Sequence, residues 1–321
     1  MQSPNGSRTV EAPEWPAHVR LVEVGPRDGF QVERTFIPTA LKLEIIHGLV
    51  SAGLTHVQVA SFVHPSRVPQ MADAEAICAA LLPAPVGVQY SALVLNAKGV
   101  DRALAAGIRS VDVSIAADDS QSASNTGMSV AEAATQAREM IQTAQAAHCT
   151  VRAGLQVVFG CRAPGDVPLA RVVAMAGEFA NLGVECISLA DSTGMADPRT
   201  VERTVAAVRA AIGDIPLVLH LHDTRGMGLA NVVAGLRQGV TCFDSSLGGM
   251  GGCPFIEGAT GNIPTDDTAN MLAQMGIHTG VDHRIVSQLA RTLERFLGRR
   301  FDGKLHALGP HQSFSPTAAS A

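Results

Sequence analysis

Aromatic side chains and long hydrophobic runs are both scarce in this chain. Only 4% of its 321 residues are aromatic, with one tryptophan and one tyrosine, so we expect no platform of rings for stacking bases. No run of about 20 apolar residues occurs, which predicts that the chain has no membrane-spanning helix. Residues 1–18 also lack the apolar core that a secretory signal needs.

Basic clusters and paired cysteines are absent as well. Lys and Arg number 24 against 29 Asp and Glu, a net charge of -5, and no basic run occurs. Neither a nucleic-acid partner nor a membrane partner is therefore expected. The six cysteines contain no CxxC pair, which indicates free thiols in a reducing compartment, and we expect a cytoplasmic location.

Apolar residues make up 46% of the chain and charged residues 17%, a composition that excludes general disorder. Short β-branched runs alternate with Ala-rich stretches that suit helices, several of which end in glycine. The expected strands are 19–24, 57–62, 86–95, 109–116, 151–159, 184–190, 216–222 and 241–246. The expected helices are 39–52, 70–82, 97–106, 129–148, 168–182, 198–212 and 226–238, with one or two more in 283–298.

This alternation predicts an α/β fold, a (β/α)8 TIM barrel with extra C-terminal helices, since such barrels take about 250 residues. An open doubly wound sheet is the alternative, and it would place a glycine-rich phosphate-binding turn after the first strand. The sequence GPRDGF at 25–30 has Arg and Asp there instead. No linker divides the chain, so we expect one catalytic domain at 19–300, with flexible tails at 1–18 and 307–321.

A His-x-His pair, His220 and His222, ends the seventh expected strand. Residues i and i+2 of a strand point to the same face, so the two imidazoles could share a metal ion. Two histidines that merely bond their neighbours in the barrel are an equally good interpretation of the pair alone. Asp28 after the first strand and Asn262 beyond the eighth add oxygen donors, and a mixed N/O set suits Mg²⁺ or Mn²⁺.

Arg27 and a glycine-rich loop each allow two interpretations. Arg27 either pairs with a neighbouring carboxylate or faces a developing enolate as a fixed cation. The loop 248–254, which has four glycines and Cys253, is either a tight surface loop or a lid that brings an acid/base thiol over the site. His306, near the C-terminus, is expected at the surface.

Six segments together resemble the 3-hydroxy-3-methylglutaryl-CoA lyase family. They are VEVGPRDGFQ (22–31), SFVHPSRVPQMAD (61–73), SLADSTG (188–194), HLHDTRGMGLANVVAGL (220–236), GGMGGCPFIEGATGN (248–262) and MLAQMGIHTGVD (271–282). The resemblance covers about residues 19–298. It implies a (β/α)8 barrel that uses a divalent cation, Mg²⁺ or Mn²⁺, and acts on bonds next to acyl carbonyls.

The resemblance also implies roles for individual residues. The implied metal ligands are Asp28, His220, His222 and Asn262. The implied catalytic residues are Arg27, Asp28, His220, Asp191 and Cys253, with His220 or Asp28 as the base. The implied substrate-side residues are Ser61, Ser192, Gln58 and Asn125.

Three departures from the family pattern leave the acyl group open. Gln58 stands where the lyases usually have the glutamate that helps to hold the arginine. The segment 116–127 keeps Asn125 but lacks the usual phenylalanine, and Phe30 replaces a common leucine.

The implied reaction is the cleavage of 3-hydroxy-3-methylglutaryl-CoA to acetyl-CoA and acetoacetate. Three alternatives are the same chemistry on a citramalyl-type or longer branched acyl-CoA, a condensing relative, and a non-catalytic metal-binding barrel. The intact set of Arg27, Asp28, His220, His222, Cys253 and Asn262 argues against the last. An acyl-CoA is the implied small-molecule partner, and a homo-oligomer is expected.

Overall fold

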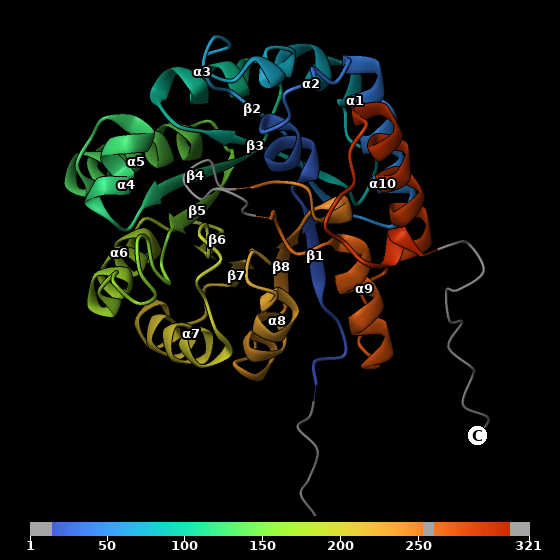
Figure 1. Ribbon diagram of the computed structural model, residues 1–321. Coiled ribbons are helices and arrows are strands. Elements are labelled where there is room, and N and C mark those ends of the chain that lie inside the picture. Colours follow the sequence, from blue (N-terminus) through green and yellow to red (C-terminus); the bar gives the residue numbers. More distant parts are fainter. Residues whose placement is uncertain (1–14, 253–259, 309–321) are drawn as a thin grey trace, which may run out of the picture.

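The computed structural model describes residues 15–252 and 260–308, which form a closed barrel of eight parallel strands surrounded by helices (Figure 1). Each strand pairs with the next one in chain order, and β8 pairs with β1 to close the ring. The predicted (β/α)8 barrel is therefore confirmed, and the open sheet is excluded because it would leave two unpaired edges. None of the helices in these ranges is long and apolar enough to cross a membrane.

The strands are β1 Arg20–Glu23, β2 His56–Ser61, β3 Gln89–Val94, β4 Ser110–Ala116, β5 Thr150–Gln156, β6 Cys186–Ala190, β7 Leu217–His220 and β8 Cys242–Ser245. The α-helices are α1 Thr39–Ser51, α2 Ala74–Leu81, α3 Ala97–Ala105, α4 Asp119–Thr126, α5 Val130–Ala146, α6 Leu169–Asn181, α7 Pro198–Ile212, α8 Gly228–Arg237, α9 Thr265–Gln274 and α10 His283–Leu297. Short helical turns are η1 Gly25–Gly29, η2 Pro69–Met71, η3 Leu247–Gly249 and η4 Leu305–Ala307.

The strands and helices follow from local chemistry. Helices cover the outer face of the barrel, so its strands are largely buried and rich in apolar residues, and every residue of β6 is buried. Helix α5 begins with a capping box formed by Ser129 and Glu132, and α7 begins with Asp197 as N-cap followed by Pro198. The last helix, α10, packs beside the first, α1, and completes the outer ring (Figure 1).

Two helices were absent from the sequence prediction, although α4 had visible start and stop signals. Asp118 caps α4 by accepting hydrogen bonds from Ser120 and Gln121, and Gly127 ends it in the left-handed region. Its polar composition hid the helical period. Helix α9 carries a fully buried acid, Asp266, which breaks the apolar pattern that would have identified it.

His306 is buried, so its expected place at the surface was wrong. Its side chain is 1% exposed, with Nδ1 3.3 Å from Asp266 Oδ2 and Nε2 3.2 Å from Glu294 Oε1. The backbone N–H of Gly303 donates to the carbonyl of Gly248 over 2.9 Å. Residues 301–308 thus fold back onto α9, α10 and η3. The position of His306 near the C-terminus gave no sign of this packing.

The protein should lose stability as the pH rises through the titration of His306. Burial acts to lower the pKa of His306, but Asp266 and Glu294 outweigh it and hold the pKa above 6.5. A histidine with a raised pKa in the folded state stabilises fully below its unfolded value, and this contribution is lost as the pH rises through the folded one. His306→Gln should therefore lower the free energy of unfolding by about 1–3 kcal/mol at acidic pH and by less at alkaline pH.

Urea unfolding of both proteins on either side of neutrality measures this effect. Glu23, whose pKa burial raises to about 7, titrates in the same range in both proteins, so the difference between them isolates His306. An equal loss of stability at every pH would show that His306 contributes packing alone.

Candidate active site

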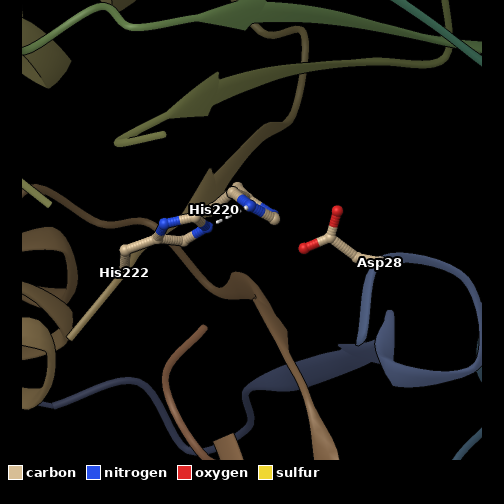
Figure 2. Close-up of side chains that lie close together, drawn as sticks. All are labelled: Asp28, His220 and His222. Carbon is tan, nitrogen blue, oxygen red and sulfur yellow. Dashed lines mark hydrogen bonds between the residues drawn. The ribbon is translucent and has the colours of Figure 1, made fainter. Parts of the chain in front are cut away.

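Three side chains meet at the carboxyl ends of the barrel strands, the end at which such barrels carry their sites. Asp28 lies in η1 directly after β1, His220 ends β7, and His222 follows two residues later. One ligand atom from each of the three lies within 4.8 Å of the others. In Figure 2 the two imidazoles lie close together, and the carboxylate of Asp28 faces them from the opposite side.

The backbone brings these side chains together in two ways. Asp28 is held in a π-helical turn, where its N–H donates to the carbonyl of Val24 over 2.7 Å. Strand β7 stops at His220, earlier than predicted, and His222 instead pairs in a short antiparallel bridge with Asn262. The two histidines still converge, with 3.2 Å between their Nε2 atoms.

Asn262 completes the group of four predicted ligands. Its Nδ2 donates to Asp28 Oδ2 over 2.7 Å and to the Met250 carbonyl over 3.0 Å. Its Oδ1 is buried and finds no hydrogen-bond partner among the residues that the structure describes. A free amide oxygen beside a carboxylate and two imidazoles is a donor set that fits Mg²⁺ or Mn²⁺.

The protonation states of the group also suit a cation. Burial acts to raise the pKa of Asp28, but Arg27, His220 and His222 outweigh it and lower the pKa. The pKa of His222 is lowered to about 3, mainly by burial and then by His220. At neutral pH the site therefore presents an ionised carboxylate and a neutral imidazole, the forms that bind metals.

Arg27 lies at the edge of this cluster and faces a cavity. Its Nη1 pairs with Asp28 Oδ1, and its Nε donates to Gln58 Oε1. Gln58 is only 2% exposed, so the amide occupies the position from which a carboxylate would hold the guanidinium. Arg27 thus makes the predicted ion pair and also presents a fixed cation to the cavity.

On the reaction that the sequence resemblance implies, Gln58→Glu should raise turnover of 3-hydroxy-3-methylglutaryl-CoA by up to about tenfold. A charged acceptor binds a guanidinium more strongly than an amide by about 1–1.5 kcal/mol, which corresponds to about tenfold in rate if the arginine is then better positioned. Steady-state kinetics of the wild type and of the variant measure this change in turnover.

Gln156→Glu is the matched control, because Gln156 also lines the cavity but bonds to Asn125 rather than to Arg27. High wild-type activity with no gain from Gln58→Glu would remove any role for this difference from the family pattern.

The cavity has a volume of about 280 Å³. Seven of the predicted site residues line it: Arg27, Asp28, Gln58, Asn125, Ser192, His220 and His222. Asn125 belongs to a chain of amides in which Gln121 Nε2 donates to Asn125 Oδ1 over 3.2 Å and Asn125 Nδ2 donates to Gln156 Oε1 over 3.1 Å. Ser192 Oγ accepts from the Val157 N–H over 3.3 Å. These groups give the cavity neutral polar walls beside the charged cluster.

Three predicted residues within the described chain do not line the cavity: Asn262, which lies against Asp28, and the residues Asp191 and Ser61. Asp191 is 1% exposed and does not line the cavity; its carboxylate accepts the N–H groups of Met195 and Ala196 over 2.8 and 3.1 Å. Burial raises the pKa of Asp191 to about 6 against those hydrogen bonds. Ser61 is fully buried at the end of β2 and is not in the cavity wall of the described structure either.

The glycine loop reaches the cavity at Gly252, and Cys253 lies outside the described residues. At Gly251, φ is +129°, and a Cβ atom would lie 2.6 Å from Asn262 Nδ2 and 3.4 Å from Asp28 Oδ2. Only glycine therefore allows the loop backbone to pass this close to the ligand group.

A buried acid that was not predicted from the sequence, Glu23, supports the site. Glu23 is fully buried, and its carboxylate accepts the N–H groups of Gly25 and Leu247 over 2.8 and 3.0 Å and the hydroxyl of Thr265 over 2.7 Å. It therefore ties the turn that carries Arg27 to the glycine loop and to α9. A charged residue inside an apolar strand, as in VRLVEV at 19–24, was the signal that could have identified it.

A closed (β/α)8 barrel with this cluster at its carboxyl end defines a barrel protein with a candidate divalent-cation site. The family model described as HMGL-like matches residues 18–293. The chain belongs to this family.

Three similar proteins support the assignment. The chain is 38% identical to hydroxymethylglutaryl-CoA lyase YngG of Bacillus subtilis, over 89% of this chain and 95% of that protein. It is 38% identical to the 3-hydroxy-3-isohexenylglutaryl-CoA/hydroxy-methylglutaryl-CoA lyase of Pseudomonas aeruginosa, over 88% and 94% of the two chains. A solved HMG-CoA lyase from Acinetobacter baumannii, in complex with coenzyme A and 3-methylmalate, superposes with a TM-score of 0.87 at 34% identity, over 94% of this chain and 98% of that one.

Proposed function

We propose that this protein is a carbon–carbon lyase that cleaves 3-hydroxy-3-methylglutaryl-CoA to acetyl-CoA and acetoacetate. The observation that carries the proposal is the convergence of Asp28, His220 and His222 beside Arg27 in one cavity of an HMGL-like barrel, with Asn262 bonded to Asp28 behind the cavity wall. The names of the similar proteins support the same substrate, and the complex with coenzyme A supports an acyl-CoA partner.

Asp28, His220, His222 and Asn262 would hold the cation, Mg²⁺ or Mn²⁺. Bound there, the cation supplies positive charge that lowers the pKa of the substrate hydroxyl and polarises the thioester carbonyl. Asp28 or His220 takes the hydroxyl proton as the C2–C3 bond breaks, so that C3 becomes the ketone of acetoacetate and C2 keeps the electron pair. Arg27 faces the resulting acetyl-CoA enolate with its guanidinium, and Cys253, or a water molecule near it, returns a proton to C2.

The remaining predicted residues have substrate-side or supporting roles in this proposal. Ser192 and Asn125 offer polar groups along the cavity wall, and Gln58 orients Arg27. Asp191 shapes the loop after β6 through its two backbone hydrogen bonds. Ser61 ends β2, three residues after Gln58.

A substrate panel tests the proposal. The purified protein with Mg²⁺ is assayed on 3-hydroxy-3-methylglutaryl-CoA, its 3-isohexenyl analogue and citramalyl-CoA, with acetyl-CoA as the measured product. We expect the highest kcat/KM on the methyl compound. Faster cleavage of another thioester would reassign the substrate, and metal binding without turnover on any of them would favour a non-catalytic barrel.

The proposal includes two expectations about the protein in the cell: that it forms a homo-oligomer, and that it works in the cytoplasm. Light scattering coupled to size-exclusion chromatography measures the first, and cell fractionation measures the second.

A further inference from the structure

A charged network crosses the interior of the barrel beneath the ligand cluster. Arg152 extends from β5 to Asp244 on β8, and these two strands are not neighbours. Its Nη1 donates to Asp244 Oδ1 over 2.8 Å, and its Nη2 pairs with Asp244 Oδ2 and donates to Ser188 Oγ over 2.9 Å. Arg152 Nε lies 3.2 Å from Asp112 Oδ1 on β4. A layer that usually holds branched apolar side chains is therefore ionic here.

The network reaches His220, one of the four candidate metal ligands. His220 Nδ1 lies 2.9 Å from Asp244 Oδ2. The strand register brings the two residues side by side, because His220 and Asp244 are Cα partners in the β7–β8 pair and both line the same cavity. Both side chains are largely enclosed by the barrel: that of Asp244 is 1% exposed and that of His220 is 12% exposed.

The carboxylate decides which ring nitrogen carries the proton. Arg152 pairs with both carboxylate oxygens of Asp244, and this bidentate ion pair holds the carboxylate in its ionised form. An ionised carboxylate only accepts hydrogen bonds, so Nδ1 of His220 must be the donor. When the ring carries one proton, Nε2 keeps its lone pair, and this nitrogen points toward His222 and Asp28.

His222 has no such support. Its Nδ1 is buried and finds no hydrogen-bond partner among the described residues. Of the two imidazoles, only His220 is oriented by the barrel interior.

We propose that Asp244, held in place by Arg152, is a positioning residue that fixes His220 with its proton on Nδ1 and its Nε2 lone pair directed into the ligand cluster. The proposal rests on the metal site of the proposed function but not on its substrate. It also commits both ring nitrogens of His220, which assigns His220 to cation binding rather than to proton transfer.

Nitrogen NMR of the metal-free wild-type protein tests the tautomer without any substitution. With ¹⁵N-labelled histidine and His220→Gln used to assign the signal, we expect the proton of His220 on Nδ1. A proton on Nε2 in the wild type would overturn the proposal.

Asp244→Asn tests the positioning role. The amide NH2 of asparagine would face either Arg152 or His220. The imidazole of His220 would therefore no longer be held in one tautomer. We expect the affinity for Mn²⁺, measured by electron paramagnetic resonance, to fall about 10- to 100-fold, the range seen for partners that orient metal ligands. The His220 signal should report a mixture of tautomers.

Asp266→Asn is the matched control, because Asp266 is also fully buried and accepts a hydrogen bond from Ser287 over 3.0 Å away from the cluster. It should leave the Mn²⁺ affinity and the tautomer unchanged. Unchanged affinity and tautomer in Asp244→Asn would refute the role of Asp244. Both measurements are made without substrate, so inactivity on 3-hydroxy-3-methylglutaryl-CoA would bear on the proposed function alone.

Discussion

Replacement of His222 by alanine should lower turnover on 3-hydroxy-3-methylglutaryl-CoA on the order of 10³-fold and abolish tight Mn²⁺ binding. The imidazole is buried, is held neutral by its low pKa and lies 3.2 Å from that of His220. A bound cation contributes several kcal/mol to the stabilisation of developing charge, and each 1.36 kcal/mol is about tenfold in rate. Titration calorimetry with Mn²⁺ and steady-state kinetics measure the two effects.

His47→Ala is the control for loss of an imidazole, because His47 is exposed on α1. Chelation of the wild-type protein should reproduce the loss seen in His222→Ala, and added Mg²⁺ or Mn²⁺ should restore activity to the wild type only. Wild-type turnover that survives complete chelation would contradict the metal-dependent mechanism.

Cys253→Ala should lower turnover by about 10²–10⁴-fold, the usual span for loss of a general acid. A free thiol with a pKa near 8.5 is mostly protonated at neutral pH, so it can donate a proton to an enolate. Gly252, the residue before it, lines the cavity. Metal affinity should stay nearly unchanged, because the four candidate ligands do not include this thiol.

Three buried cysteines provide the controls. Cys78, Cys149 and Cys186 are less than a tenth exposed, and burial raises the pKa of their thiols to about 12, 11 and 12. Alanine at these positions should cost packing energy only, with turnover unchanged. If Cys253→Ala keeps wild-type turnover, the thiol is incidental and a water or a histidine supplies the proton.

Much of the fold and part of the site could be predicted from the sequence, because the signals are local. Alternation of β-branched runs with Ala-rich stretches predicted all eight strands of the barrel. The His-x-His spacing at the end of a strand predicted that His220 and His222 converge. Asp28 and Asn262 could be added because the ends of parallel strands meet at one rim of a barrel.

Only the tertiary structure decided which residues that are distant in the sequence contact each other. Arg152 and Asp244 stand 92 positions apart, and only the closure of the barrel puts the guanidinium of one against the carboxylate of the other. His306 is buried because residues 301–308 return to α9 and α10. A charged or polar side chain is tolerated inside a protein only beside a partner, and when that partner is distant in the chain, the sequence shows the lone residue but not the pair.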